Sequence, residues 1–357
     1  MNLRKVSFFI LFLVLAVASC KKDDPVTEVI VEIEDRTEQQ LKDMDSLNKY
    51  LENHYYNSEY IESLGTNASI SDIEIKKLET GQTDAPVGYT MLKKGDVLAP
   101  KLVKYSVKYE DTDYEYFVLN LNIGGGINSP KFSDKIRFNY EGFTLEDAVF
   151  DYSVFPFDSD LVGNGVTTFG LIPGWKKIMP SFKTAESFVE NSDGTISYTN
   201  KGLGVMFLPS GLAYFSNATT GIPAYSPIIF KFELLQMFEN DHDGDGIPSY
   251  LEGADDDFEF TLNTDEDFTS DSYGNVYPRY NYIDNDDDGD GKLTKDEIII
   301  TTFTADTVEA VRSKSLAYNE VLLNKIIDNR NGTYTGTIIK FKDTVVGEPF
   351  DYLDKDN

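Results

Sequence analysis

Cysteine is almost absent from this sequence. Its 357 residues include one cysteine, two histidines and one tryptophan. A single cysteine excludes an internal disulfide and dithiol redox chemistry within the chain. The two histidines, His54 and His242, lie at unrelated places, and neither belongs to a serine–histidine or cysteine–histidine arrangement that could carry out acyl transfer. The composition therefore argues against nucleophilic catalysis.

Positive charge is also scarce. The chain has 32 lysines and arginines against 61 aspartates and glutamates, so its formal net charge is -29 at pH 7. Proteins bind nucleic acid by neutralising phosphates with lysine and arginine, and an excess of carboxylates opposes this. We therefore expect no nucleic-acid partner, and calcium is the counter-charge that the composition favours.

Aromatic residues, in contrast, are plentiful. The sequence contains 22 tyrosines and 24 phenylalanines, and 41% of its residues are hydrophobic. Such a composition is typical of β-rich globular domains rather than of disordered chains. The length leaves room for two or three domains.

The first twenty residues predict an export signal. Two basic residues precede the apolar run 6–17, which ends shortly before Cys20. A cleaved secretory signal or an uncleaved membrane helix would also fit, although the run is shorter than the roughly 20 apolar residues that a span needs. Residues 15–20 resemble a bacterial lipobox with Val17 in place of the usual leucine. We therefore predict a lipoprotein signal peptide at 1–19 and a lipid on Cys20.

An acidic tether is expected to follow the lipid, over residues 20–36. A triacylated cysteine carries more than one acyl chain, which stable membrane anchoring requires. Residues 21–24, Lys-Lys-Asp-Asp, resemble a tag that sends some Gram-negative lipoproteins to the cell surface, although they also fit the solvated start of a tether. We predict a bacterial outer-membrane lipoprotein that faces either the periplasm or the cell surface.

A helix is predicted after the tether, over residues 37–56. Apolar side chains recur there at steps of three and four from Leu41 to Tyr55, and Thr37 with Gln40 fits a capping box. The helix could pack on the following domain or form a dimer seam. The sequence leaves the oligomeric state open.

Strands are predicted next, within the N-terminal region 37–114 and beyond it. Residues 101–109 and 115–123 alternate between polar and apolar side chains and are joined by a short polar segment, which predicts a hairpin. The triple glycine at 124–126 lacks the spacing of a phosphate-binding loop and is interpreted as a turn.

Six separated motifs between residues 136 and 235 form a series. They are a strand that ends in glycine (136–142), Phe150-Asp151, Leu171-Ile172-Pro173-Gly174-Trp175, Ala213-Tyr214, Ile222-Pro223 and a closing strand (228–235). In order and spacing these motifs resemble the FKBP family of peptidyl-prolyl isomerases, over about residues 115–237. The resemblance implies an α+β fold in which a twisted antiparallel sheet wraps around a short helix, expected to start at 176–182.

The same resemblance implies roles for nine residues of a proline-binding pocket. These residues are Tyr140, Phe150, Asp151, Leu171, Ile172, Trp175, Tyr214, Ile222 and Phe230. Trp175 would form the floor, and the N–H of Ile172 on the rim would hold a substrate carbonyl. Asp151 would lie beside the twisting carbonyl, and Tyr214 would donate its hydroxyl to the peptide.

The implied reaction is rotation about a proline peptide bond, which requires no cofactor. Rotation costs about 18–20 kcal/mol because the twisted amide loses its resonance. The twisted amide is also less polar than the planar one, so a dry pocket favours it. The expected substrates are X-Pro segments of polypeptides, and the expected role is to assist the folding of exported proteins. Alternatively, the aromatic residues form an ordinary core and the domain only binds chains, although the lone Asp151 has no purpose in a core.

The chain departs from the family pattern at two positions, both expected near the pocket rim. Residues 186–201 are a polar insert, and Phe215 replaces the glycine that usually follows the Ala-Tyr motif. These departures keep a second function open: a calcium-stabilised binding, adhesion or chaperone lipoprotein whose FKBP fold is catalytically inactive.

Beyond residue 237 the composition changes to aspartate, asparagine and glycine. Two loops match the calcium-loop spacing in full, with carboxylates at positions 1, 3 and 5, glycine at 6 and glutamate at 12. The predicted side-chain ligands are Asp241, Asp243, Asp245 and Glu252 in the first loop and Asp286, Asp288, Asp290 and Glu297 in the second. The further predicted ligands are the main-chain oxygens of Ile247 and Lys292 at position 7, with Ser249 and Thr294 at position 9.

The calcium ions are expected to be structural. Loops of this kind without flanking helices also resemble the calcium repeats of thrombospondin type 3, a version that Pro248 favours for the first loop. The alternative is a solvated acidic linker. A helix at 307–328 and a hairpin about Asn331-Gly332 are predicted in the tail. The expected division of the chain is 1–19, 20–36, 37–114, 115–237, a loop-rich calcium module at 238–300, and a tail at 301–357.

Overall fold

The computed structural model describes most of the chain beyond the tether. The described residues are 33–164, 168–253, 255, 258–260, 268–270, 276–342, 346–347 and 350–354. Asp35–Asn357 forms one compact unit, separate from Met1–Glu34. The signal peptide, Cys20 and nearly all of the tether lie outside the described residues. Within the described ranges, every helix is too short or too polar to cross a bilayer.

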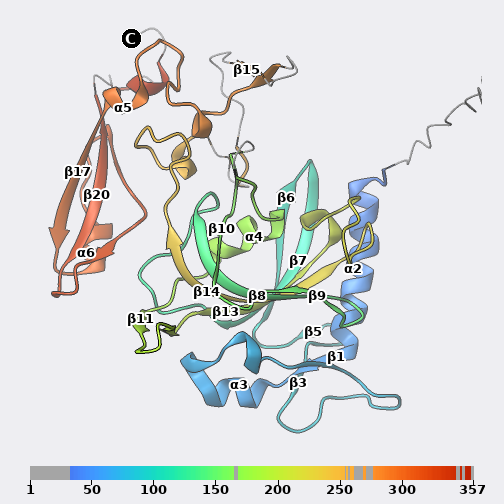
Figure 1. The fold of residues 1–357 in the computed structure, drawn as a ribbon. Helices are drawn as coiled ribbons and strands as arrows, with labels where there is room; N and C mark the ends of the chain where they lie inside the picture. Colours follow the sequence, from blue (N-terminus) through green and yellow to red (C-terminus); the bar gives the residue numbers. More distant parts are fainter. Residues whose placement is uncertain are drawn as a thin grey trace, which may run out of the picture. The chain divides into compact units, whose positions relative to one another are not determined.

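A seven-stranded antiparallel sheet forms the centre of the unit (Figure 1). Its strand order is β10-β8-β14-β13-β7-β6, and β9 pairs with β8. The strands are β6 (Leu102–Tyr109), β7 (Thr112–Asn122), β8 (Lys135–Thr144), β9 (Val149–Tyr152), β10 (Phe157–Asp160), β13 (Gly202–Leu208) and β14 (Ile228–Phe238). With the short helix α4 (Pro173–Ile178), which begins earlier than the expected 176–182, this arrangement confirms the predicted α+β class.

The predicted hairpin is formed by β6 and β7. Glu110 and Asp111 connect the strands with φ angles of 47° and 58°, a left-handed turn that matches the twist of paired strands. The sequence-based boundary between residues 114 and 115 falls inside β7. Strands β6 and β7 both belong to the central sheet.

Both faces of the central sheet are covered. Met206 and Leu208 of β13 belong to a core that contains Trp175 of α4, whereas Val205 and Phe207 belong to a second core on the other face. Every residue of β13 is therefore buried, and the strand shows no alternation between polar and apolar residues.

The helix α2 (Arg36–Asn53) packs on the second core, as the packing alternative predicted. Its N-cap is Asp35, whose side chain accepts a hydrogen bond from the N–H of Glu38, so the capping box predicted at Thr37 is wrong. The buried face is also rotated from the predicted one, because Leu41 is 70% exposed.

Asp43 fixes α2 to the segment that carries Tyr214. This buried carboxylate accepts hydrogen bonds from the N–H and Oγ of Ser210, at 2.7 and 2.6 Å, and from Nε2 of Gln39, at 2.6 Å. Ser210 begins the short 3-10 helix Ser210–Leu212, which directly precedes the Ala-Tyr motif. The N-terminal helix therefore holds one wall of the predicted pocket.

Small elements surround the sheet on the N-terminal side and at the insert. They are β1 (His54–Tyr56), α3 (Ser58–Leu64), β2 (Ile75–Lys77), β3 (Thr90–Met91), β4 (Lys93–Lys94), β5 (Val97–Leu98), β11 (Ser187–Glu190) and β12 (Ile196–Thr199). Strands β2-β1-β3 form a three-stranded sheet, and β4-β5 and β11-β12 are separate hairpins.

A four-stranded sheet ends the chain. Its strands are β17 (Ile298–Ala305), β18 (Glu320–Leu322), β19 (Ile327–Asp328) and β20 (Tyr334–Phe341). The other elements of this part of the chain are the helices α5 (Thr294–Glu297) and α6 (Val308–Arg312) and the paired strands β15 (Phe268–Ser270) and β16 (Val276–Pro278). The predicted helix over 307–328 is wrong, because helix stops at Arg312 and β18 and β19 pair with β20 instead. The hairpin about Asn331-Gly332 is confirmed.

The C-terminal sheet shares its core with the first acidic loop. Ile247 of that loop is fully buried among Ile298, Ile339 and Phe341. The sequence-based boundary between residues 300 and 301 falls inside β17, so the acidic module and the tail form one packed structure.

Asp134 lies fully buried where the central sheet meets the acidic segment. Its carboxylate accepts hydrogen bonds from the N–H of Lys131 at 2.7 Å and from the N–H of Asn240 at 3.3 Å. Burial raises the pKa of Asp134 from 3.8 to about 7. The folded state therefore binds this proton more tightly than the unfolded state does.

We expect this group to stabilise the fold below pH 4 and to lose that contribution as the pH rises through about 7. Asp134→Asn has no carboxyl group to titrate at this position, so it should not lose stability in this way. The wild type should therefore lose up to about 4 kcal/mol more free energy of unfolding than this variant when the pH rises from 4 to 8. Urea unfolding at both pH values measures the difference. The exposed Asp96→Asn is the control, and equal pH dependence in both variants would contradict the expectation.

Candidate active site and candidate metal centre

The nine residues predicted to form the pocket come together in one cluster. Trp175 is 3% exposed and lies in the first turn of α4, which begins with a proline. The ring centroids of Phe138 and Phe230 lie 4.8 and 5.2 Å from that of Trp175. Gly174 permits this approach of helix and sheet, since a Cβ there would meet the side chain of Leu208 at 2.5 Å.

Strands β8 and β9 place a tyrosine next to a carboxylate at the edge of this cluster. The hydroxyl of Tyr140 donates a hydrogen bond of 2.8 Å to Oδ2 of Asp151, and Oδ1 of Asp151 accepts one of 2.9 Å from the N–H of Tyr152. Burial and the hydrogen bond to Asp151 raise the pKa of Tyr140 above its ordinary value. The exposed carboxylate is therefore held in a fixed orientation beside an aromatic floor.

Glycine at position 142 explains the strand-end motif. A Cβ there would lie 2.6 Å from the rings of both Phe150 and Phe230. Without one, these two rings meet edge to face at 5.5 Å. The motif therefore makes room for two walls of the predicted pocket.

The remaining predicted residues lie around the same floor. Ile222 is buried in the core of Trp175, and Leu171, Ile172 and Tyr214 are half-buried against it. Among the described residues, the N–H of Ile172 has no hydrogen-bond acceptor, whereas its carbonyl accepts from the N–H of Trp175 at 3.0 Å. The Ile172 N–H is thus available to a ligand.

The two departures noted in the sequence, Phe215 and the insert 186–201, each make contacts of their own. Phe215 occupies the left-handed region, at φ 48°, which glycine adopts more readily than other residues. Its ring packs on Tyr225 and under the guanidinium of Arg36, 4.2 Å from the ring centroid, so it serves the contact with α2. The insert 186–201 forms the β11–β12 hairpin. Its Phe188 lines a groove with Ile326 and Arg330, which flank β19.

The two acidic loops share one set of internal hydrogen bonds. In each loop the carboxylate at position 1 accepts a hydrogen bond from the N–H of the glycine at position 6. The carboxylate at position 3 accepts one from the N–H of position 5, and the carboxylate at position 5 accepts one from the N–H of position 7. The pairs are Asp241–Gly246, Asp243–Asp245 and Asp245–Ile247 in the first loop and Asp286–Gly291, Asp288–Asp290 and Asp290–Lys292 in the second. Both loops therefore adopt one conformation.

The position 9 hydroxyls close both loops. Ser249 Oγ accepts from the N–H of His242 at 3.1 Å, and Thr294 Oγ1 accepts from the N–H of Asp287 at 3.1 Å. The prediction that Ser249 and Thr294 contribute to metal binding stays a prediction, and these hydrogen bonds show in addition that both hydroxyls tie position 9 to position 2 of their loops.

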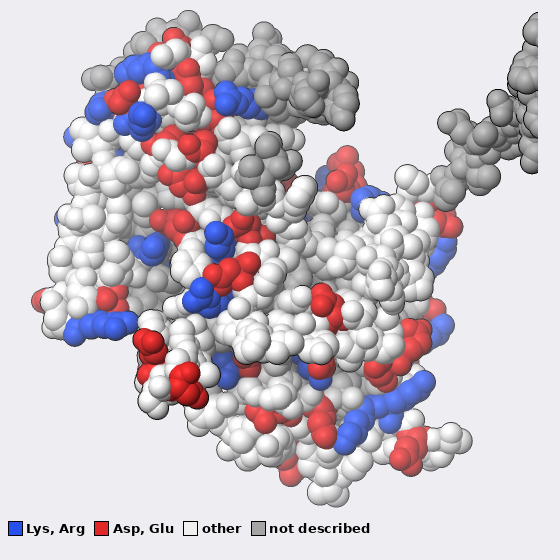
Figure 2. All heavy atoms as spheres, viewed as in Figure 1, with Lys and Arg blue, Asp and Glu red and all other residues white. Residues whose placement is uncertain are grey.

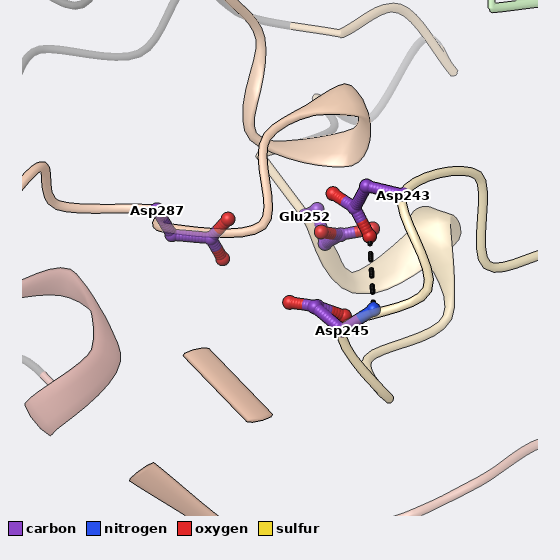
Figure 3. A group of neighbouring side chains, drawn as sticks. All are labelled: Asp243, Asp245, Glu252 and Asp287. Atoms are coloured by element: carbon purple, nitrogen blue, oxygen red, sulfur yellow. Dashed lines mark hydrogen bonds between the residues drawn. The ribbon is translucent and has the colours of Figure 1, made fainter. Parts of the chain in front are cut away.

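The carboxylates gather in two groups that differ from the predicted sets. One carboxylate oxygen each of Asp243, Asp245, Glu252 and Asp287 lies within 4.8 Å of the others, and the same holds for Asp286, Asp288 and Asp290. Figure 3 shows the first of these groups. Neither group includes Asp241 or Glu297, and Glu297 instead pairs with Lys292 at 3.0 Å. Asp287 was missed because the calcium-loop pattern assigns no ligand to position 2.

Burial disfavours the ionised form of the carboxylates in the first group. Burial, with repulsion from neighbouring carboxylates, raises the pKa of Glu252 to about 11, of Asp287 to about 10, of Asp243 to about 8 and of Asp245 to about 7. All the donors are carboxylate oxygens, which are the ligands that a hard cation such as calcium prefers. The residues present therefore fit a calcium ion.

The first loop also contacts the segments that carry Trp175. His242 Nε2 lies 3.0 Å from the carbonyl oxygen of Val162, in the segment between β10 and α4. Lys176 and Lys177, the two residues after Trp175, both pair with Glu259, at 2.7 and 2.6 Å. The predicted pocket and the acidic segment therefore share contacts that the sequence did not indicate.

Charge on the surface is mixed. On the face drawn in Figure 2, acidic and basic side chains are interspersed among uncharged ones. The excess of carboxylates in the composition is therefore not gathered into one patch on that face.

The sequence matches no protein-family model and no curated protein. Among solved structures, it is similar to a peptidyl-prolyl cis-trans isomerase from Pseudomonas syringae pv. tomato, with 18% identity over 39% of this chain and 82% of that one and a TM-score of 0.28. It is also similar to FkpA from Escherichia coli, with 17% identity over 66% of this chain and 73% of that one and a TM-score of 0.28. Likeness at this level is too low to support a function, which has to be inferred from the residues of the site.

Proposed function

We propose that this chain is a peptidyl-prolyl cis-trans isomerase of the FKBP type. The observation that carries the proposal is the carboxylate of Asp151, held by Tyr140 at 2.8 Å at the edge of the buried aromatic floor of Trp175. An exposed carboxylate at the margin of an aromatic cluster has no role in packing, and it suits a site that orients a polar ligand over an apolar surface.

The residues would favour the twisted amide by solvation and positioning. A proline ring would lie on Trp175, in surroundings less polar than water. The twisted amide is less polar than the planar one, so it would lose less solvation free energy on entering these surroundings. The N–H of Ile172 would donate a hydrogen bond to a substrate carbonyl, and Tyr214 would donate its hydroxyl to the peptide. Interactions that are stronger in the twisted state than in the planar state lower the barrier, and neither a cofactor nor a nucleophile is needed.

The direct test is turnover by the chain from Lys21 onward. Catalysis should appear as a faster cis-to-trans relaxation of a Leu-Pro or Phe-Pro test peptide, which relaxes over tens to hundreds of seconds unaided. Saturable binding of the peptide without acceleration would instead support a chain-binding protein with an inactive fold.

We further propose that both acidic loops bind structural calcium. Support comes from the complete spacing in the sequence, the shared internal hydrogen bonds and the two groups of carboxylates. Calcium in these loops would stiffen the segment that links the central sheet to the C-terminal one.

Membrane anchoring through Cys20 is likewise our proposal. It is supported by the apolar run and the lipobox-like residues 15–20. A Cys20→Ser variant should lack the acyl mass that the mature wild-type chain carries and should leave the membrane fraction. Identical intact masses and identical fractionation of the two chains would contradict the proposal.

A further inference from the structure

Asp287 belongs to the second acidic loop, yet its carboxylate lies with the ligands of the first. One of its oxygens lies within 4.8 Å of an oxygen of each of Asp243, Asp245 and Glu252. Figure 3 shows Asp287 on a separate segment, with its side chain directed towards the other three. Three other aspartates of the second loop, Asp286, Asp288 and Asp290, form a group of their own.

The burial of this group points to a ligand. Glu252 is 2% exposed and Asp287 is 3% exposed, and none of their four carboxylate oxygens has a hydrogen-bond partner among the described residues. One oxygen of Asp243 and one of Asp245 are also buried without a partner. Buried polar groups are normally hydrogen-bonded, and buried charges are normally paired or coordinate metals.

We propose that one calcium ion is bound jointly by Asp243, Asp245, Glu252 and Asp287, and that this ion fastens the two acidic loops to each other. The inference rests on the proposed binding of calcium and adds a ligand from the other loop. Calcium suits the site better than magnesium because it accepts six to eight oxygens in flexible geometry, whereas magnesium demands a near-ideal octahedron and retains water.

The joint ion would hold the C-terminal sheet in place. Within the first loop, Ile247 is buried in the core of that sheet, and the hydroxyl of Tyr250 accepts a hydrogen bond of 2.9 Å from the N–H of Asn324. The second loop leads through α5 directly into β17. An ion between the loops therefore connects the start of the acidic segment, just after β14, to the first strand of the C-terminal sheet.

The test is calcium titration calorimetry on the chain from Lys21 onward, which contains the whole compact unit, after removal of metal with a chelator. Wild type should bind two calcium ions. Asp243→Asn and Asp287→Asn should weaken the same binding event, each by at least about tenfold, since even an indirect supporting residue of a metal site is worth 10–100-fold in affinity. Asp290→Asn should weaken the other event. The exposed Asp296→Asn, at position 11 of the second loop but in neither group of carboxylates, should change neither.

The asparagine variants keep side-chain size and remove one of several like charges, so they should fold, which circular dichroism checks. If Asp243→Asn weakens one event while Asp287→Asn leaves both unchanged, the loops bind calcium separately and the inference is wrong. If the wild type binds no calcium, both the joint ion and the proposed structural role of calcium are wrong. The isomerase proposal is tested separately, by turnover.

Discussion

Replacing Asp151 with alanine should lower kcat/KM for an X-Pro test peptide by about tenfold or more, a loss of at least about 1.4 kcal/mol of transition-state stabilisation. The physical reason is that the carboxylate is fixed by Tyr140 and the N–H of Tyr152 next to the aromatic floor. Its field would therefore act on the twisting amide of a bound substrate without any cost of reorientation. The rate of relaxation of the peptide, measured at several peptide concentrations, gives the value.

Two further variants separate orientation from charge. Tyr140→Phe keeps the ring and removes only the hydroxyl that holds Asp151, so it should lose less activity than Asp151→Ala. Asp193→Asn, in the exposed turn of the β11–β12 hairpin, removes a carboxylate that accepts hydrogen bonds from Thr195 of the same turn, and it should retain full activity. Equal activity of wild type and Asp151→Ala would remove the enzymatic interpretation.

Calcium should stabilise the chain by about 5 kcal/mol when both loops are occupied at 100 times their dissociation constants, since each site contributes about 2.7 kcal/mol. Sites of this ligand type in extracellular modules have dissociation constants of about 10⁻⁴ to 10⁻³ M, so roughly 10 to 100 mM calcium is required. The melting temperature should then rise by several degrees, on the order of 5–10 °C.

Asp245→Asn combined with Asp290→Asn removes one carboxylate from each group and should abolish most of this rise. An equal concentration of magnesium controls for ionic strength and should have a smaller effect. The whole chain from Lys21 is the right sample, because the C-terminal sheet also contacts the central unit: Asn128 accepts from the N–H of Ile326 at 2.9 Å. If calcium and magnesium shift the melting temperature equally in wild type and variant, the loops bind no calcium specifically.

Long-range contacts account for the corrections to the predicted elements. The helical pattern at 307–328 competes with strand pairing to β20, which starts at Tyr334, and the pairing wins because it completes a sheet around Ile339 and Phe341. In α2 the spacing of apolar residues at three and four positions predicted the helix but not the face that is buried. The polar Asp43 lies on the buried face because it accepts a hydrogen bond from Ser210, which is 167 residues away in the sequence. Propensity is a weak prior, and tertiary context overrides it in both places.

The sequence by itself determined the features that depend on neighbours a few residues apart. The conformation of each acidic loop follows from hydrogen bonds within seven positions, such as Asp241 with Gly246, and the pocket motifs follow from side chains whose identity and spacing are visible in the chain. The tertiary structure alone decided which distant groups share a site. It placed Asp287 with the first loop and Glu259 with Lys176 and Lys177, because burial and charge bring together residues that no periodicity in the sequence connects.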